Sequence, residues 1–329
     1  TKRNDDQIFT NAQLRYKFTD WLDIRVAYSK AISRPDFQAI LPNIFYNPGP
    51  DLVNQAGNPK LKPSISTNFD AFISFYNNEI GLFTIGGFYK KIDDVFFQTE
   101  IYYQNIALYD IWFPDSVFWA AQDTKVPVPN ERIQTWINNP NPAYLKGLEF
   151  EWQTNFWYLP GFLNSLVLNV NYTKVWSEID YKQVRNIAEN FIDPVTGRLT
   201  SRYYTVDTIR TARLLNQGDD ILNLALGVDY KGFSGRISFN MQGNVITSVG
   251  QTRPEEDQFT GNIYKWDFTL KQELPIEGLS VQLSGVNIFH NVTETYRKFR
   301  RVNDGAVFDN LLGLQYSPRI FELNVRYTL

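Results

Sequence analysis

The sequence predicts an all-β fold, a transmembrane antiparallel β-barrel, of which about eleven strands lie in this chain of 329 residues. Apolar and polar residues alternate in many segments, the connections alternate between very short and very long, and 16% of the residues are aromatic. The mean hydropathy is nevertheless only −0.33. A helical membrane protein would show apolar runs of about 20 residues, and the sequence contains none. Strands with one apolar and one polar face reconcile many aromatic residues with a polar average.

Strict alternation, the sequence signal of a β-strand with two different faces, recurs about eleven times. Most of these segments have roughly 10–15 residues, whereas strands in soluble sheets usually have about 5–6. A tilted strand needs about 9–11 residues to cross the apolar part of a membrane. The expected strands are 12–18, 21–32, 64–77, 81–97, 144–158, 165–178, 219–231, 233–247, 261–273, 279–290 and 318–329.

The last of these segments shows both faces clearly. Its apolar face carries Phe321, Leu323, Val325, Tyr327 and Leu329. Its polar face carries Glu322, Asn324, Arg326 and Thr328. A soluble β-sandwich alternates in the same way with its apolar face turned inward, so alternation alone does not distinguish a barrel from a soluble surface-binding β protein.

The connections favour the barrel. The short turns carry turn-forming residues and lie at Thr19-Asp20, Asn77-Asn78-Glu79, Leu159-Pro160-Gly161, Lys231-Gly232 and Pro275-Ile276-Glu277-Gly278. The long connections, expected to be structureless, lie at 33–63, 98–143, 179–218, 248–260 and 291–317. A compact soluble domain rarely contains several structureless loops of more than about 15 residues. Outer-membrane barrels, in contrast, combine tight periplasmic turns with long outer loops.

Aromatic residues on the outward phase of the strands predict two membrane-interface belts. When the short turns are assigned to the periplasm, one group falls toward the outer end, namely Tyr28, Tyr89, Tyr172 and Tyr264. A second group falls toward the periplasmic end, namely Phe18, Phe75, Tyr158, Tyr230, Phe233 and Tyr327. Amphipathic rings favour the two interfaces of a bilayer, although aromatic residues also favour strands in general.

The odd strand count indicates part of a larger barrel. Bacterial single-chain barrels have an even number of strands, and an open sheet edge inside lipid leaves unpaired backbone groups that cost several kcal/mol each. We therefore expect residues 1–329 to be the C-terminal part of a barrel, with about as many strands again preceding Thr1.

Composition excludes several functions. The chain has no cysteine and a single histidine, which excludes disulfides, thiolate metal sites and sites of several histidines. We expect no metal and no cofactor. A net charge of −3 argues against nucleic acid as a partner, which would need a basic face. A Ser–His pair could use only His290, and the sequence has no serine nucleophile motif, so we do not expect an enzyme.

Several stretches resemble TonB-dependent outer-membrane receptors, especially those of Bacteroidetes-type bacteria. Residues 28–37 read Y-S-K-A-I-S-R-P-D-F, and residues 57–63 read G-N-P-K-L-K-P, although Ser64 stands where many relatives have Glu. Further similar stretches are Lys146-Gly147-Leu148-Glu149, the Asn287-Ile288-Phe289 strand end and Ser317-Pro318-Arg319 before the terminal strand. Their order and spacing cover most of the chain.

This resemblance implies a 22-stranded barrel in the bacterial cell outer membrane, closed by an N-terminal plug that is absent from this chain. It implies active uptake of a scarce nutrient of the glycan, siderophore or peptide class. The implied partners are membrane lipid and lipopolysaccharide, the TonB complex acting through the plug, and a surface lipoprotein in a carbohydrate-type subfamily. The alternative is a passive porin or a secretion-associated barrel without a plug.

Two outer loops carry candidate substrate-binding residues. The aromatic candidates in 98–143 are Tyr102, Trp112, Trp119 and Trp136, which either offer a stacking surface or form a small core, the interpretation we favour. The candidates in 179–218 are Arg185 and Arg202, which suit an anionic group but also an ordinary solvated loop. Glu149 and Glu151 could support acid–base chemistry, but mixed charges on an inner barrel wall more often pair with each other or with a plug.

Overall fold

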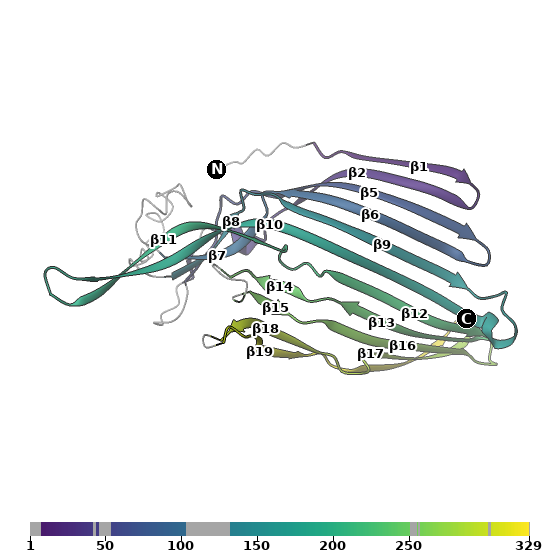
Figure 1. The fold of residues 1–329 in the computed structure, drawn as a ribbon. Helices are drawn as coiled ribbons and strands as arrows, with labels where there is room; N and C mark the ends of the chain where they lie inside the picture. Colours follow the sequence, from purple (N-terminus) through teal and green to yellow (C-terminus); the bar gives the residue numbers. More distant parts are fainter. Residues whose placement is uncertain are drawn as a thin grey trace.

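The computed structural model describes residues 8–41, 44–45, 54–102, 132–250, 255, 257–301 and 304–328. Its main feature is a long antiparallel sheet in which each strand pairs with the next along the path (Figure 1). The path runs through β1 (Asn11–Thr19), β2 (Leu22–Ser33), β5 (Ser64–Asn77), β6 (Gly81–Asp93), β9 (Ala143–Asn155), β10 (Leu166–Ile192), β12 (Asp220–Tyr230), β13 (Phe233–Gln242), β16 (Ile263–Glu273), β17 (Leu279–Val286) and β20 (Ile320–Tyr327). These are the strands that the alternating segments predict.

The sheet has one apolar face that continues from strand to strand. Leu226 on β12, for example, lies level with Leu168 on β10 and with Ile237 on β13. Leu226 is 44% exposed and Leu323 on β20 is 68% exposed. No second sheet covers this face among the described residues. The prediction of a single barrel wall is therefore confirmed, and the soluble sandwich is excluded.

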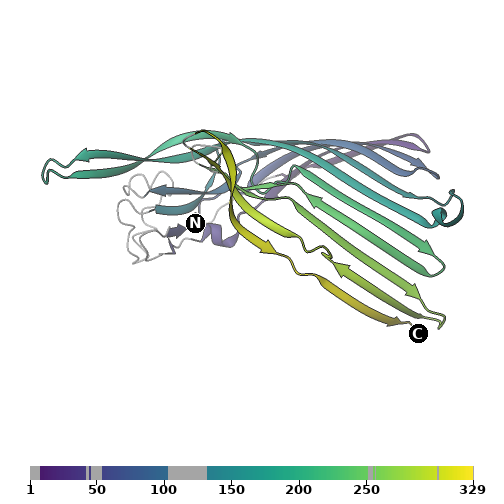
Figure 2. The same ribbon diagram turned by 60° about the horizontal axis from the view of Figure 1, so that its bottom comes forward.

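The sheet curves between two free edges. β1 lies at one edge and β20 at the other, and among the described strands neither has a second neighbour. Figure 2 shows the curvature, with the C-terminal strand and the N-terminal strands on opposite sides. In the described part of the chain, no helix has the length and apolar character needed to cross a membrane.

The short turns have the backbone that their residues predict. Lys231 and Gly232 have φ values of 47° and 75°, as a two-residue type I′ hairpin requires. Gly278 has a φ of 77°, and a Cβ atom there would lie 2.1 Å from the carbonyl oxygen of Thr328. Only glycine fits this approach of the turn to the last strand.

The long connections contain strands, so the expectation that they are structureless is wrong. β10 extends to Ile192 rather than ending near 178, and it forms a projecting hairpin with β11 (Leu199–Ala212) (Figure 1). Two other predicted strands are each divided in two: 81–97 between β6 and β7, and 233–247 between β13 and β14. The other additional elements are α1 (Phe37–Ile40), β3 (Ile44–Phe45), β4 (Asn54–Ala56), β7 (Phe96–Tyr102), β8 (Arg132–Asn138), η1 (Gly161–Ser165), β14 (Val245–Ser248), β15 (Gln258–Thr260), β18 (Val292–Arg300) and β19 (Val307–Tyr316).

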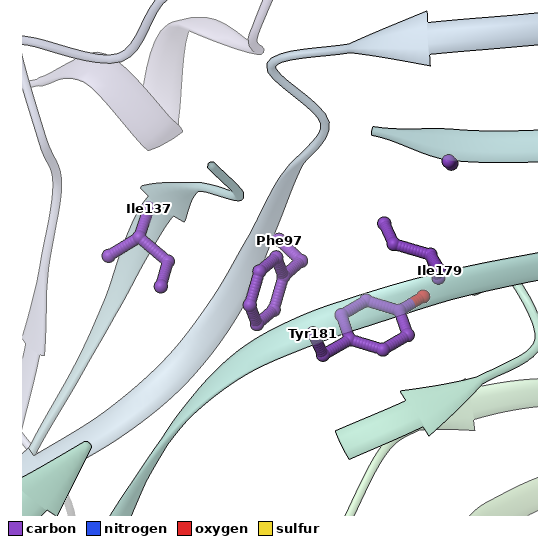
Figure 3. Close-up of a cluster of buried hydrophobic side chains, with 5 residues drawn as sticks. Phe97, Ile137, Ile179 and Tyr181 are labelled. Atoms are coloured by element: carbon purple, nitrogen blue, oxygen red, sulfur yellow. The ribbon is translucent and has the colours of Figure 1, made fainter. Parts of the chain in front are cut away.

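A small hydrophobic core lies among these additional strands. Phe97 of β7, Ile137 of β8, and Ile179 and Tyr181 of β10 are each at most 3% exposed. The ring of Phe97 lies edge-on to that of Tyr181 at 5.0 Å (Figure 3). This core joins the base of the projecting hairpin to the β7–β8 pair and forms the floor of the candidate site.

Asn287 connects the last two strands of the sheet. It is 1% exposed and has a φ of 54°. Its backbone N–H donates to Asp267 at 2.7 Å, its side-chain amide donates to the carbonyl of Ser317 at 3.0 Å, and its side-chain oxygen accepts from the N–H of Asn291 at 2.9 Å. Two of the stretches with a family resemblance, at 283–289 and 317–319, are therefore joined by this residue.

We expect Asn287→Ala to destabilise the folded barrel by about 1–3 kcal/mol, because buried polar partners lose their hydrogen bonds and alanine is strained at positive φ. Urea unfolding of the whole protein in lipid vesicles measures the change. Asn324→Ala is the matched control, because Asn324 is exposed on the polar face of β20. Equal effects of the two substitutions would contradict the role given to Asn287.

Candidate functional site: a cavity beneath the outer loops

A cavity of about 700 Å³ lies where the β7–β8 pair, the base of the β10–β11 hairpin and the β14–β15 pair meet. Ser33 and Ser64 line it from the ends of β2 and β5 that are remote from the short turns. The cavity therefore lies at the outer end of the barrel wall. Its volume falls within the about 300–1,000 Å³ typical of small-molecule sites.

Aromatic rings form part of the cavity wall. Phe97 and Tyr181 are buried in the core described above, whereas Phe96 and Trp136 are half-buried. The rings of Phe96 and Trp136 lie 6.3 Å apart at an angle of 61°. Two ring surfaces that meet at such an angle can contact a ligand from two sides.

Neutral amides provide most of the polar wall. Four glutamines from four strands line the cavity, namely Gln98, Gln134, Gln183 and Gln258. Asn216, in the loop after β11, also lines it. Each amide offers both donors and an acceptor, so the wall can bind groups of either hydrogen-bonding kind.

Asparagines join the backbone segments around this cavity. Asn139 is fully buried; its amide donates to the carbonyl of Asp180 at 3.0 Å, and its oxygen accepts from the N–H of Lys182 at 3.0 Å. Asn58 donates to the carbonyl of Trp136 at 2.9 Å. These bonds attach the β10 extension and the β4 region to the β8 strand, and thereby set the position of the cavity wall.

Tyr181 positions the loop that closes one side of the cavity. It lies on β10 beyond the part that pairs with β12, and therefore outside the membrane-spanning segment. Its hydroxyl accepts from the N–H of Leu215 at 2.9 Å and donates to the carbonyl of Arg213 at 3.2 Å. Burial raises the pKa of the Tyr181 phenol well above its ordinary value, so this residue stays neutral at physiological pH.

Two arginines at the end of β11, Arg210 and Arg213, are paired with carboxylates. Arg210 donates to both carboxylate oxygens of Asp257, one of them at 2.6 Å, and the two side chains are only 12% and 5% exposed. Arg213 lies 3.1 Å from the carboxylate of Asp219. These pairs connect the end of β11 to the strands that follow it and neutralise charge beside the cavity.

The predicted binding residues have mixed outcomes. Trp136 lines the cavity, and Ile137, the next residue on β8, belongs to the core. Trp112 and Trp119, together with the side chains of Tyr102 and Arg185, lie outside the described residues. Arg202 lies on β11 opposite Glu189, exposed on the projecting hairpin. Of the members of this set whose side chains the structure describes, Trp136 lines the cavity and Arg202 does not. The glutamines were not among the predicted residues.

The predicted interface aromatics lie on the apolar face of the strands, apart from Tyr158, which follows β9. In the outer group, Tyr28 contacts Phe69, Tyr89 stacks on Tyr144 and Tyr264 stacks on Phe239. The hydroxyl of Tyr172 donates to Asp220 at 2.6 Å. The second group lies at the ends near the short turns, namely Phe18, Phe75, Tyr158, Tyr230, Phe233 and Tyr327. Their position at a membrane interface stays a prediction.

A smaller niche of about 170 Å³ lies on the polar face of the sheet. Arg25, Glu149 and Glu151 line it, so the two carboxylates singled out in the sequence do lie close to an arginine. Gln153 donates to Glu151 at 2.5 Å. His290, the single histidine, stacks against Tyr316 rather than facing this niche. The niche has the mixed charge expected of an inner barrel wall.

The tip of the β10–β11 hairpin is closed by Asp193. Its carboxylate accepts from the backbone N–H groups of Thr196 and Val195, and these bonds lower the pKa of Asp193 below its ordinary value. A lowered folded pKa means that the stabilisation is present above the unfolded pKa and is lost as the pH falls through the folded value.

We therefore expect amide exchange at 194–198 to accelerate as the pH falls into the range where Asp193 is protonated, after correction for intrinsic exchange rates. Asp193→Ala should show the fast exchange already at pH 7. Hydrogen–deuterium exchange with mass spectrometry measures both. Asp304→Ala is a control in a different exposed turn, and it should leave 194–198 unchanged.

Comparison with known proteins identifies the architecture. Residues 1–288 match the family described as "TonB dependent receptor-like, beta-barrel". Among curated proteins, no sequence matches this chain.

Solved receptor structures share the fold. A mutant ferric enterobactin receptor, PfeA, from Pseudomonas aeruginosa superposes with a TM-score of 0.56 at 13% identity, covering 96% of this chain and 39% of that chain. The siderophore receptor PirA from Acinetobacter baumannii gives a TM-score of 0.52 at 14% identity, covering 96% and 40%. At such identities the likeness concerns the fold alone. The chain spans about two fifths of the length of the receptors it matches.

Proposed function

The chain belongs to the TonB-dependent receptor β-barrel family, and we propose that it is the C-terminal part of a plugged active transporter that takes up a scarce nutrient. The family consists of outer-membrane transporters and not of enzymes. The observation that carries the proposal is the cavity at the outer end of the wall, above a polar inner face. The nutrient would be a glycan, a siderophore or a peptide.

The proposed mechanism has three steps. The substrate binds in the cavity, where Trp136 and the neutral amides contact it. A plug from the part of the receptor that precedes this chain blocks the lumen and contacts the charged inner wall near Arg25, Glu149 and Glu151. TonB then pulls on the plug, and the substrate enters the lumen.

Two features support the proposal of a larger barrel. Both edge strands, β1 and β20, are exposed along their whole length in the described sheet, and unpaired backbone groups inside lipid cost several kcal/mol each. Eleven further strands preceding β1 would pair with both edges and close a 22-stranded barrel. The order of the sequence stretches at 28–37 and 57–63 supports an origin in Bacteroidetes-type bacteria.

The proposed partners follow from the same architecture. Membrane lipid and lipopolysaccharide would contact the apolar face, and the TonB complex would act through the plug. A surface lipoprotein would dock on the outer loops if the transporter is of the carbohydrate type.

Ion conductance separates this proposal from its alternative, a passive porin or a secretion-associated barrel. The whole native receptor, reconstituted in planar lipid bilayers, should show no steady ion current, because the plug fills the lumen. It should also bind the purified periplasmic domain of TonB. A stable open-channel current together with no TonB binding would overturn active transport and favour the porin.

A further inference from the structure

The described wall of the cavity beneath the outer loops is uncharged. Among the described residues that line it, there is no lysine, arginine, aspartate or glutamate. Recognition of a carboxylate, a phosphate or an anionic iron chelate normally uses arginine or lysine. In the part of the wall that the structure describes, the groups that an anionic ligand needs are therefore absent.

Two arginines close in sequence or space to the lining residues, Arg210 and Arg213, are already paired with carboxylates. Asp257, next to the lining residue Gln258, accepts both Arg210 and the backbone N–H of Gly250, the latter at 2.8 Å. Arg213 is held by Asp219 and also donates to Asn244 at 2.7 Å. A ligand anion would have to compete with a carboxylate already in place for either guanidinium.

The polar groups that remain suit hydroxyls. The amide side chains of the glutamines combine donors with acceptors, and a sugar hydroxyl is itself both a donor and an acceptor. Serine and threonine from β2, β5 and β14 add further neutral groups to the wall. Each such group can satisfy a ligand hydroxyl without a change of protonation.

The half-buried rings suit the C–H faces of a sugar. Phe96 and Trp136 expose part of their surface to the cavity and are inclined at 61° to each other. Apolar ring faces beside a few convergent polar groups are typical of small-molecule sites. A peptide would bring ionisable termini and side chains, for which the described wall offers no counter-charge.

We propose that this cavity binds a neutral oligosaccharide, with Trp136 and Phe96 contacting the sugar rings and the glutamines contacting the hydroxyls. The proposal rests on the proposed transport function, whose substrate it narrows from three classes to one. Binding of a peptide or of an anionic siderophore is a contrary outcome of the test.

The test is a glycan array probed with the whole receptor, fluorescently labelled in detergent micelles, in parallel with titrations of ferric enterobactin and of neutral and acidic peptides. We expect retention on uncharged glycans and not on their uronic-acid or sulfated counterparts. Retention only on acidic glycans, binding of ferric enterobactin or a peptide instead, or no binding to any neutral glycan would overturn the proposal.

Substitution then assigns the binding to this cavity. Trp136→Ala should raise the dissociation constant for the retained glycan roughly tenfold, about 1.4 kcal/mol, because the aromatic contact with the ligand is lost. Asn58 donates to the backbone carbonyl of Trp136, and the alanine variant keeps this carbonyl and its hydrogen bond. Trp176→Ala is the matched control. Trp176 is 45% exposed and lies on the face of β10 opposite to the cavity-lining residues Tyr181 and Gln183. Equal losses in both variants would place the glycan elsewhere.

Uptake into cells is measured separately, so that failure of the substrate proposal can be distinguished from failure of the active-transport proposal. TonB-dependent uptake of some other solute, with no glycan binding, would overturn the substrate and leave active transport standing. Glycan binding with unchanged entry in cells lacking TonB would leave the substrate standing and overturn active transport.

Discussion

Leu226→Arg is expected to lower the free energy of unfolding from lipid vesicles by about 2–4 kcal/mol. Leu226 lies near the middle of β12, and its level neighbours on the apolar face are Leu168 and Ile237. An arginine there would face hydrocarbon, and the cost is greatest at the midplane of the bilayer because the charge lies farthest from water.

Asn223→Arg is the matched control for this substitution. Asn223 lies on the same strand but on the polar face, exposed, level with Asn171 and Asn240. We expect Asn223→Arg to change the free energy of unfolding by well under half of the change caused by Leu226→Arg. Urea titration of the whole protein in vesicles, followed by tryptophan fluorescence, measures both. If the two variants lose the same stability, the apolar face does not face lipid.

The barrel wall was predictable because lipid imposes a simple rule on it. Every strand that crosses the bilayer needs an apolar outer face, so apolar residues occupy every second position over most of β12, β16 and β20. The hairpin turns were predictable for a similarly local reason, since Lys231-Gly232 carries the glycine that positive φ requires. Both signals depend only on neighbouring residues.

The outer strands were missed because lipid covers neither of their faces, so nothing imposes a regular alternation of apolar and polar residues on them. β18 reads VTETYRKFR, in which polar residues occupy both phases, so no binary pattern marks it as a strand. The extension of β10 beyond residue 178 has the same cause. Its inward residues Ile179 and Tyr181 are buried by β7 rather than by lipid, and that contact is invisible in the local sequence.

The candidate site was predictable only in part. Trp136 was found because aromatic residues are conspicuous in a loop, whereas glutamines carry no motif. The cavity forms through contacts between distant segments, such as the parallel pairing of Asn54 with Ile133. A pattern within one segment cannot predict which side chains such pairings bring together. The arginines of 179–218 show the same limit, because Arg210 looks free in sequence and is paired with Asp257 in space.

Arg210→Ala is expected to lower the local stability of the β14–β15 region by about 3–5 kcal/mol, because it leaves the carboxylate of Asp257 buried without its partner. Asp257 is 3% exposed and otherwise accepts a backbone N–H from Gly250. The double variant Arg210→Ala/Asp257→Ala should recover a substantial part of the loss, since it removes the uncompensated charge as well. Hydrogen–deuterium exchange at 245–250 and 257–260 in the whole protein measures the local opening.

Arg236→Ala provides the contrast in the same chain. Arg236 and Asp229 are joined at 2.6 Å but are 35% and 49% exposed, and an exposed pair contributes only about 0–1 kcal/mol. We expect little change in exchange beside this pair, and none in the strands around the cavity. If Arg210→Ala behaves like Arg236→Ala, the buried pair does not hold the β14–β15 wall. In that case the glycan affinity of the Arg210→Ala variant should be unchanged. If the wall is displaced, as we expect, both the glycan affinity and the exchange protection of 257–260 should fall.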